Sequence, residues 1–318
     1  MNKRTVVTGG AGFIGSHLAD CLVKRGDAVL IIDDFSTGRL DNLVQIQNQV
    51  ETIDTDIANS ETIDLIAAYK PDTVFHLAAQ MDVRHSVGNP ISDAKTNIIG
   101  LLNVFEGARK CQAKKVVIAS SGGTIYGESD SEVFLTTDEY AKRRPICPYG
   151  VAKVASDLYL DVYRTLYGMS GTSLALGNVY GPRQNPHGEA GVVSIFAGAL
   201  LDSKQVSIFG TGEQVRDFVY VIDAVEAFLC AEQYNGSHLF NIGTGIGTSI
   251  NDLYKMLASI TNSSDKPKFE KARKGELNRS VLNSQLAYYK LGWQPSISLY
   301  SGLERTVEWF KTLEDSNG

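Results

Sequence analysis

A glycine-rich turn near the start of the chain constrains its fold more than any other feature. It joins an apolar run at 4–8 to a helical pattern at 12–25. Glycines here allow a tight turn, close approach of the backbone to a pyrophosphate, and close packing of helix on strand. The unpaired N–H groups at the start of a helix then bind the anion. We predict a dinucleotide site rather than a plain strand–helix turn. Its residues are Gly9, Gly10, Ala11, Gly12, Phe13, Ile14 and Gly15.

An acidic residue, Asp33, ends the second apolar run, 18 positions after Gly15. In dinucleotide-binding folds a carboxylate at this place accepts hydrogen bonds from the ribose hydroxyls. Asp33 and the adjacent Asp34 would repel a 2′-phosphate, which favours NAD over NADP. Arg39, a few residues later, is the kind of side chain that would accept such a phosphate.

Short β-branched runs alternate with amphipathic helical patterns through the first 180 residues. This alternation predicts right-handed βαβ units and an α/β protein with a Rossmann-type doubly wound parallel sheet. Several runs are apolar at successive positions, as expected of strands covered on both faces. The predicted strands are 4–8, 28–33, 50–54, 73–78, 115–121 and 172–177, and the clearest helices are 12–25, 93–111 and 149–167.

The regular alternation of strand and helix patterns ends at about residue 178, where loops rich in Gly, Pro and Asn begin. A chain of 318 residues is long enough for about two domains. We predict a dinucleotide-binding domain in residues 1–177 plus about 217–242. A smaller α/β substrate domain, built from insertions, is predicted in about 178–216 and 243–318.

Charge and composition exclude several classes of function. The net charge is −6 and the basic residues are scattered, so neither nucleic acid nor an anionic membrane surface is an expected partner. No apolar run approaches the ~18 residues of a membrane span. The four cysteines show no metal-ligand spacing, so we expect no metal site and a reducing, cytoplasmic location.

Further crevice residues are predicted from the strand ends, because ligands of a doubly wound sheet bind at the carboxyl ends of its strands. These strand ends carry Asp56, Ile57, His76, Leu77, Ala78, Ala79, Ser120 and Ser121.

Tyr149 and Lys153 stand four residues apart at the start of a long helical pattern, so they share a helix face. A free tyrosine, with a pKa of ~10, is a poor base at neutral pH. A nearby ammonium and the positive nicotinamide of NAD⁺ would lower that pKa toward the working range. In isolation the pair would be read as a surface contact; beside a dinucleotide site it indicates catalysis.

Nine motifs resemble, in their order, those of the extended short-chain dehydrogenase/reductase family. They are TGGAGFIGSH, HLAAQ, DAKTNIIG, SSGGTIYGE, PYGVAK, NVYGPRQ, VRDFVYV, FNIGTG and a late LGW. Within the family the chain most resembles the nucleotide-sugar 4-epimerases, in particular those that interconvert UDP-glucose and UDP-galactose. The similarity extends from about residue 4 to about residue 312.

The resemblance assigns expected roles to individual residues. Tyr149 is the catalytic base and acid, and Lys153 is its partner and a ligand of the nicotinamide ribose. Asn97 holds its helix beside the cofactor. A hydroxyl, Ser121 or alternatively Thr124, assists at the sugar 4-oxygen; we favour Ser121. The expected nucleotide ligands are Asn178, Arg216 and Arg273 on the diphosphate, Phe209 on the uracil and Glu276 on its ribose.

Two departures from the family pattern bear on the reaction. Family dehydratases and decarboxylases carry acidic residues where this chain has Gly122 and Gly123, which favours simple epimerisation. Many relatives have an aromatic pair where this chain has Ala175-Leu176-Gly177, which affects the expected sugar contacts. Ser280 takes a position that flanks the sugar C2 substituent. A small residue there predicts that UDP-GlcNAc and UDP-GalNAc are accepted as well.

The resemblance therefore implies an NAD-dependent UDP-hexose 4-epimerase that works through a 4-keto sugar. The alternatives are a UDP-glucuronate 4-epimerase, another nucleotide-sugar enzyme of the family, or, less favoured, a noncatalytic NAD sensor. A homodimer formed through helices 93–111 and 149–167 is also expected by analogy. The sequence leaves the physiological sugar and pathway open.

Overall fold

The computed structural model of the chain describes residues 3–128, 143–186, 191–273 and 276–315. Its largest element is a seven-stranded sheet in which every neighbouring pair is parallel. The strand order reverses between β1 and β4, where a ligand crevice opens in sheets of this kind. In spatial order the strands are β3 (Val50–Asp54), β2 (Ala28–Asp33), β1 (Arg4–Thr8), β4 (Thr73–His76), β5 (Lys115–Ser121), β6 (Gly171–Leu176) and β10 (His238–Ile242).

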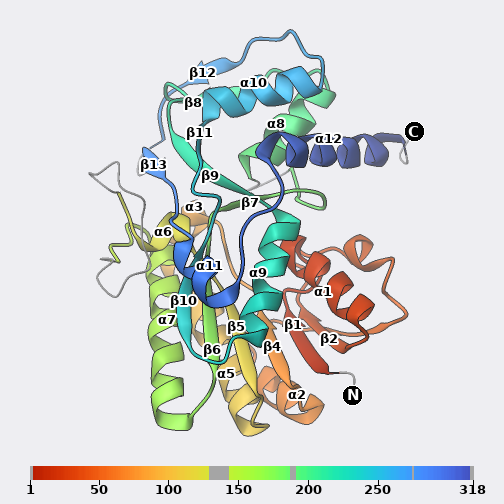
Figure 1. Cartoon of the computed structure of the whole chain (residues 1–318), viewed down its shortest axis with the longest axis vertical. Helices are drawn as coiled ribbons and strands as arrows, with labels where there is room; N and C mark the ends of the chain where they lie inside the picture. The colour runs from red at the N-terminus through yellow and green to blue at the C-terminus, as the bar shows by residue number, and fades with distance from the viewer. Residues whose placement is uncertain (1–2, 129–142, 187–190, 274–275, 316–318) are drawn as a thin grey trace.

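Helices cover both faces of this sheet (Figure 1). Successive strand residues point to opposite faces, so Val6 packs in one core and Val7 in the other. This double burial explains the continuous apolar runs of the sequence and confirms the predicted parallel sheet. One face carries α1 (Phe13–Arg25), α9 (Val221–Gln233) and α11 (Gln285–Leu291), and the other carries α2 (Glu61–Tyr69), α5 (Leu101–Lys110) and α7 (Pro148–Tyr167).

A smaller α/β part lies above the carboxyl ends of the large sheet in Figure 1. In its sheet β9 pairs with three strands, and α8, α10 and α12 form a separate core against it, distinct from the two cores of the large sheet. The chain then returns through α9 and β10 to the large sheet. The strands are β7 (Asn178–Tyr180), β9 (Val215–Tyr220), β11 (Gly247–Ser249), β13 (Arg279–Ser280) and a separate pair, β8 (Ser207–Phe209) with β12 (Lys268–Glu270); the helices are α8 (Val192–Leu201), α10 (Ile250–Ile260) and α12 (Leu299–Asp315).

The helix predicted at 93–111 is the element in which the structure differs most from prediction. It begins as α4 (Pro90–Ala94), continues as a π-helical segment, Lys95–Gly100, and becomes α5 at Leu101. A π turn inserts an extra residue into the helix, and such turns are frequent at functional sites. Here the turn contains Asn97, whose side chain leaves the helix to bond a neighbouring loop. Shorter helices are α3 (Val83–Gly88), α6 (Gly122–Ile125) and a 3₁₀ turn at Leu40–Leu43.

Among the described residues, every helix falls short of the length and apolarity needed to cross a membrane.

Candidate active site

A cleft of about 2630 Å³ lies between the large sheet and the smaller part of the molecule. Of the residues that the sequence predicts here, only Gly10, Ala11, His76 and Asn97 do not line it. From the large sheet come Gly9, Gly12, Phe13, Ile14, Gly15, Asp33, Asp56, Ile57, Leu77, Ala78, Ala79, Ser120, Ser121, Thr124, Tyr149 and Lys153; from the smaller part come Asn178, Phe209, Arg216, Arg273, Glu276 and Ser280.

The turn between β1 and α1 leaves no room for side chains at two of its glycines. Gly9 has a φ of +70°, and a Cβ there would lie 2.6 Å from the backbone nitrogen of Ala78. A Cβ on Gly15 would overlap the carbonyl oxygen of Gly9. Gly12 stands before α1 and offers no side chain to cap it. The N–H groups at the start of α1 are therefore left for a ligand, which fits the pyrophosphate of a dinucleotide.

The carboxylate of Asp33 braces the same turn. It accepts hydrogen bonds from the backbone N–H of Ala11, at 2.9 Å, and of Phe35, at 3.0 Å. Burial raises its pKa above the ordinary value. A carboxylate has about four lone-pair sites, so two backbone contacts leave capacity for the ribose hydroxyls that the sequence predicts. Arg39 pairs with Asp41 at 2.8 Å.

Asn97 is buried behind the cleft wall. Its amide nitrogen donates to the carbonyl oxygen of Gln80, at 2.8 Å, and to Asp93, at 2.9 Å, while its oxygen accepts from the Gln80 N–H at 3.0 Å. Asn97 thus fastens the loop after β4 to the helix. Gln80 itself lines the cleft.

Tyr149 and Lys153 project from the first turns of α7, and Ser121 ends β5. Ser121 also acts on Tyr149 as a hydrogen-bonding side chain that opposes the rise in the pKa of Tyr149. Thr124 instead donates to the carbonyl oxygen of Ser121, at 3.5 Å. The Nζ of Lys153 lies 5.6 Å from the Tyr149 ring centre and donates to the carbonyl oxygen of Ala119 at 2.8 Å. Ser121 therefore stays the favoured hydroxyl partner of the tyrosine, with Thr124 as the alternative.

The pKa values of this pair follow from burial. Burial raises the pKa of Tyr149, with Asp93 adding to the effect and Ser121 opposing it. Burial lowers the pKa of Lys153 to about 8. The sequence analysis expects Lys153 and the positive nicotinamide of NAD⁺ to lower this tyrosine pKa together; within the protein alone, burial raises it. The reason is that desolvation of the phenolate outweighs the nearby polar groups.

The glycine pair beside Tyr149 faces Ser280 and Leu282. A Cβ on Gly122 would lie 2.5 Å from Leu282, whereas one on Gly123 would meet Ser280 Oγ at 3.9 Å. Ser280 is itself buried. Two small residues, Gly123 and Ser280, therefore form this part of the cleft wall. Neither carries the carboxylate that the sequence analysis expects of dehydratases here.

The residues predicted to bind the nucleotide form two contacts with one another. Arg216 pairs with Glu276 at 3.3 Å, and burial lowers the pKa of this guanidinium. The guanidinium of Arg273 lies 3.8 Å over the ring of Phe209 and covers one face of that ring. The two guanidinium groups and Asn178 line one cleft, and an arginine fork is suited to phosphate oxygens.

The sequence analysis missed two buried carboxylates near Lys153, Asp93 and Asp157. Asp157 stands four residues after Lys153 on the buried face of α7. A charged residue on that apolar stripe was the available signal. Gln80 was also missed, although it follows the predicted strand-end residues directly.

Comparison with known proteins agrees with this geometry. The family model described as GDP-mannose 4,6 dehydratase matches residues 6–306. A UDP-glucose 4-epimerase of Mycolicibacterium smegmatis is 44% identical over 311 residues, covering 97% of this chain and 98% of the relative.

Two solved structures are similar throughout. One is a UDP-glucose 4-epimerase of Thermotoga maritima with UDP-glucose, with a TM-score of 0.94 and 44% identity over 98% of this chain and 99% of that chain. The other is a UDP-glucose 4-epimerase of Thermus thermophilus in complex with NAD, with a TM-score of 0.89 and 38% identity over 97% of this chain and 99% of that chain. By sequence, fold and cleft alike, the chain belongs to the GDP-mannose 4,6 dehydratase family, within the extended short-chain dehydrogenases/reductases.

Proposed function

We propose that the chain is an NAD-dependent 4-epimerase that interconverts UDP-glucose and UDP-galactose. The observation that carries the proposal is a single cleft that joins Tyr149, Ser121 and Lys153 to a dinucleotide turn on one side and to two arginines on the other. Relatives named UDP-glucose 4-epimerase, at 44% identity over nearly the whole chain, support it. Glycines at 122 and 123 argue against dehydration and decarboxylation, which need an acid there.

The proposed cofactor is NAD, which a solved relative contains. When bound, it takes a hydride from C4 of the sugar and returns it. The glycine turn would hold its pyrophosphate, Asp33 the adenosine ribose, and Tyr149 with Lys153 the nicotinamide ribose. The remaining cofactor contacts would come from Asp56, Ile57, Leu77, Ala78 and Ala79, with Asn97 fastening the loop behind them.

The residues of the chain would move one proton and hold one anion. Tyr149 would take the proton of the sugar 4-hydroxyl and return it to the 4-keto sugar, while Ser121 bonds the same oxygen. The ammonium of Lys153 would favour the phenolate that forms. Arg216, Arg273 and Asn178 would hold the diphosphate while the sugar ring turns, so that binding of the unreactive part permits movement of the reacting part.

The substrate range is proposed to include UDP-GlcNAc and UDP-GalNAc, since Ser280 and Gly123 leave the C2 side of the cleft open. A UDP-N-acetylglucosamine 4-epimerase of Methanobrevibacter ruminantium is among the similar solved structures, at 31% identity.

The test is to incubate the enzyme separately with UDP-glucose, UDP-GlcNAc and UDP-glucuronate and to analyse the sugar in each product. We expect C4 epimers of the first two, without net consumption of NAD. Epimerisation of UDP-glucuronate alone would establish the other 4-epimerase activity, and stoichiometric reduction of NAD would indicate a dehydrogenase. Tyr149→Phe separates an enzyme, which loses turnover, from a sensor, which keeps its response to NAD.

The proposed assembly is a cytoplasmic homodimer. α7 exposes apolar side chains at Val151, Leu158, Val162 and Leu166, which are 45–66% accessible, and such a contiguous apolar face typically marks an interface. Leu158→Lys should convert the dimer to monomer in sedimentation analysis, whereas Tyr289→Lys, at an exposed position of α11, should not. A wild-type monomer would refute the proposal.

A further inference from the structure

The buried face of α7 carries three ionisable side chains one turn apart, of which the proposed reaction uses only two. Tyr149 and Lys153 are followed after four residues by Asp157, which is 4% exposed. Residues at this spacing are neighbours on a helix surface. Carboxylates are almost never fully buried without a partner, so Asp157 calls for a role.

Asp157 is only partly neutralised by its immediate neighbours. Its Oδ1 accepts a hydrogen bond from the hydroxyl of Ser173, on β6, at 2.6 Å. Its Oδ2 lies 3.5 Å from Arg143 Nη1 and accepts no hydrogen bond within the described part of the chain. Asp161, one turn further along α7, is a second negative charge near it. Tyr126 also faces this cluster and is neutral, because burial raises its pKa.

Two buried carboxylates act on the charge of Lys153. Its Nζ donates to the carbonyl oxygen of Ala119, a neutral partner that does not balance the ammonium charge. The negative charges that act on Lys153 are Asp157, from α7, and Asp93, from α4. His76, on β4, also faces it and stays neutral, because burial lowers its pKa to about 3.

We propose that Asp157 is a positioning residue that acts through its charge, one turn along the buried face of α7, to keep Lys153 an ammonium beside Tyr149. Its effect on turnover rests on the proposed function, whereas its effect on Lys153 does not. Burial raises the pKa of Asp157 to about 6, against the opposing hydrogen bond from Ser173. Burial lowers the pKa of Lys153 to about 8, and Asp157 is the foremost charge that opposes this. Carboxylate and ammonium therefore coexist between about pH 6 and pH 8.

The kinetic test compares the pH profile of kcat in the wild type and in Asp157→Asn. Loss of the carboxylate should move the alkaline limb to lower pH by about one unit, as expected for removal of a nearby opposite charge. Asp157→Glu should restore most of the shift. The matched control is Asp161→Asn, on the same helix but 61% exposed at its side chain, which should leave the profile unchanged. A drop in kcat that is equal at all pH values would overturn the proposal.

A direct titration keeps the proposal testable without catalysis. In NAD-bound enzyme labelled with ¹³Cε-lysine, the Lys153 resonance, assigned by its loss in Lys153→Met, should titrate at lower pH in Asp157→Asn. An unchanged Lys153 pKa would refute the inference. If Asp157→Asn does not fold, Ser173→Ala is the second variant. It removes the hydrogen bond that lowers the pKa of Asp157, so the change in the Lys153 resonance caused by ionisation of Asp157 should move to higher pH. If this change stays at the same pH, the inference is contradicted. Failure of all three UDP-sugars to react would refute the proposed function and leave this titration valid.

Discussion

Single residues differ sharply in how much change they allow, and Gly15 allows very little. Its Cβ would overlap the Gly9 carbonyl, so Gly15→Ala must push α1 away from the turn. Such overpacking costs about 1–3 kcal/mol. Because the displaced turn is the one that would bind NAD, the affinity for NAD should fall on the order of tenfold or more. Gly88→Ala is the control, because a Cβ there has no atom within 4 Å. Calorimetric titration with NAD measures both, and equal affinities would contradict the role of the turn.

Ser280 controls a different property, the choice of sugar. Tyrosine in place of serine would fill the space between positions 280 and 123, where the two small residues now face each other. We expect Ser280→Tyr to lower the rate on UDP-GlcNAc relative to UDP-glucose by a factor on the order of ten or more, the range in which pocket shape discriminates substrates. Competition between the two substrates measures this ratio. An unchanged ratio means that Ser280 does not gate the C2 substituent.

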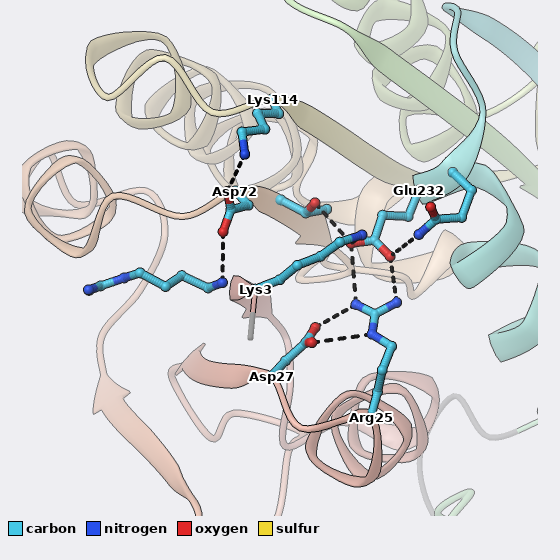
Figure 2. Close-up of polar contacts among 9 residues, drawn as sticks. Lys3, Arg25, Asp27, Asp72, Lys114 and Glu232 are labelled. Carbon is cyan, nitrogen blue, oxygen red and sulfur yellow. Dashed lines mark hydrogen bonds and ion pairs between the residues drawn. The ribbon is translucent and has the colours of Figure 1, made fainter. Parts of the chain in front are cut away.

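Among the elements, a charged cluster around Glu232 connects helices to the large sheet (Figure 2). Glu232, near the end of α9, pairs with Arg25 of α1 at 2.6 Å and with Lys3 at 3.1 Å, and accepts a hydrogen bond from Thr73 of β4 at 3.0 Å. Its side chain is 1% exposed. One carboxylate thus connects elements that are far apart in the sequence.

Glu232→Gln should lower the free energy of unfolding by about 2 kcal/mol at pH 7, as for hydrogen bonds to a charged group. Burial acts to raise the Glu232 pKa, but the bonds from Arg25 and Lys3 outweigh it, so the folded pKa is lowered. The stabilisation is therefore full above the unfolded pKa and lost as pH falls through the folded value. Urea unfolding should show the two proteins converging in acid. Asp64→Asn, in an exposed pair with Lys110, should change little.

In the whole molecule, the cleft is lined by residues of both the large sheet and the smaller part. A ligand bound in the cleft contacts both parts, so it should raise the free energy of unfolding of the complete chain. At about a hundredfold excess over Kd, a ligand adds about 2.7 kcal/mol to the free energy of unfolding. NAD, added to protein freed of it, and then UDP should each raise Tm. Arg216→Ala should keep the NAD increment and lose most of the UDP increment in thermal unfolding. Retention of the full UDP increment would remove Arg216 from the proposed diphosphate site.

Much of the fold was predictable because it depends on neighbours in the sequence. All six predicted strands are present with ends within two residues of those observed. Strand and helix periodicities are local, and so are the glycine turn and the Tyr149–Lys153 spacing. The helix predicted at 93–111 was the exception, because the π turn at Asn97 forms to reach Gln80, a partner from another part of the chain.

A parallel α/β sheet, a dinucleotide turn and a Tyr–Lys pair on one helix face all follow from local sequence patterns. The pairing of Glu276 with Arg216 and the stacking of Arg273 on Phe209 follow only from how distant segments pack together. The ionisation of the site follows from the same packing, since burial raises the pKa of Tyr149 and lowers that of Lys153. The physical reason is that desolvation and distant pairing depend on every segment packed around a group, whereas spacing along one helix or strand depends only on the segment itself.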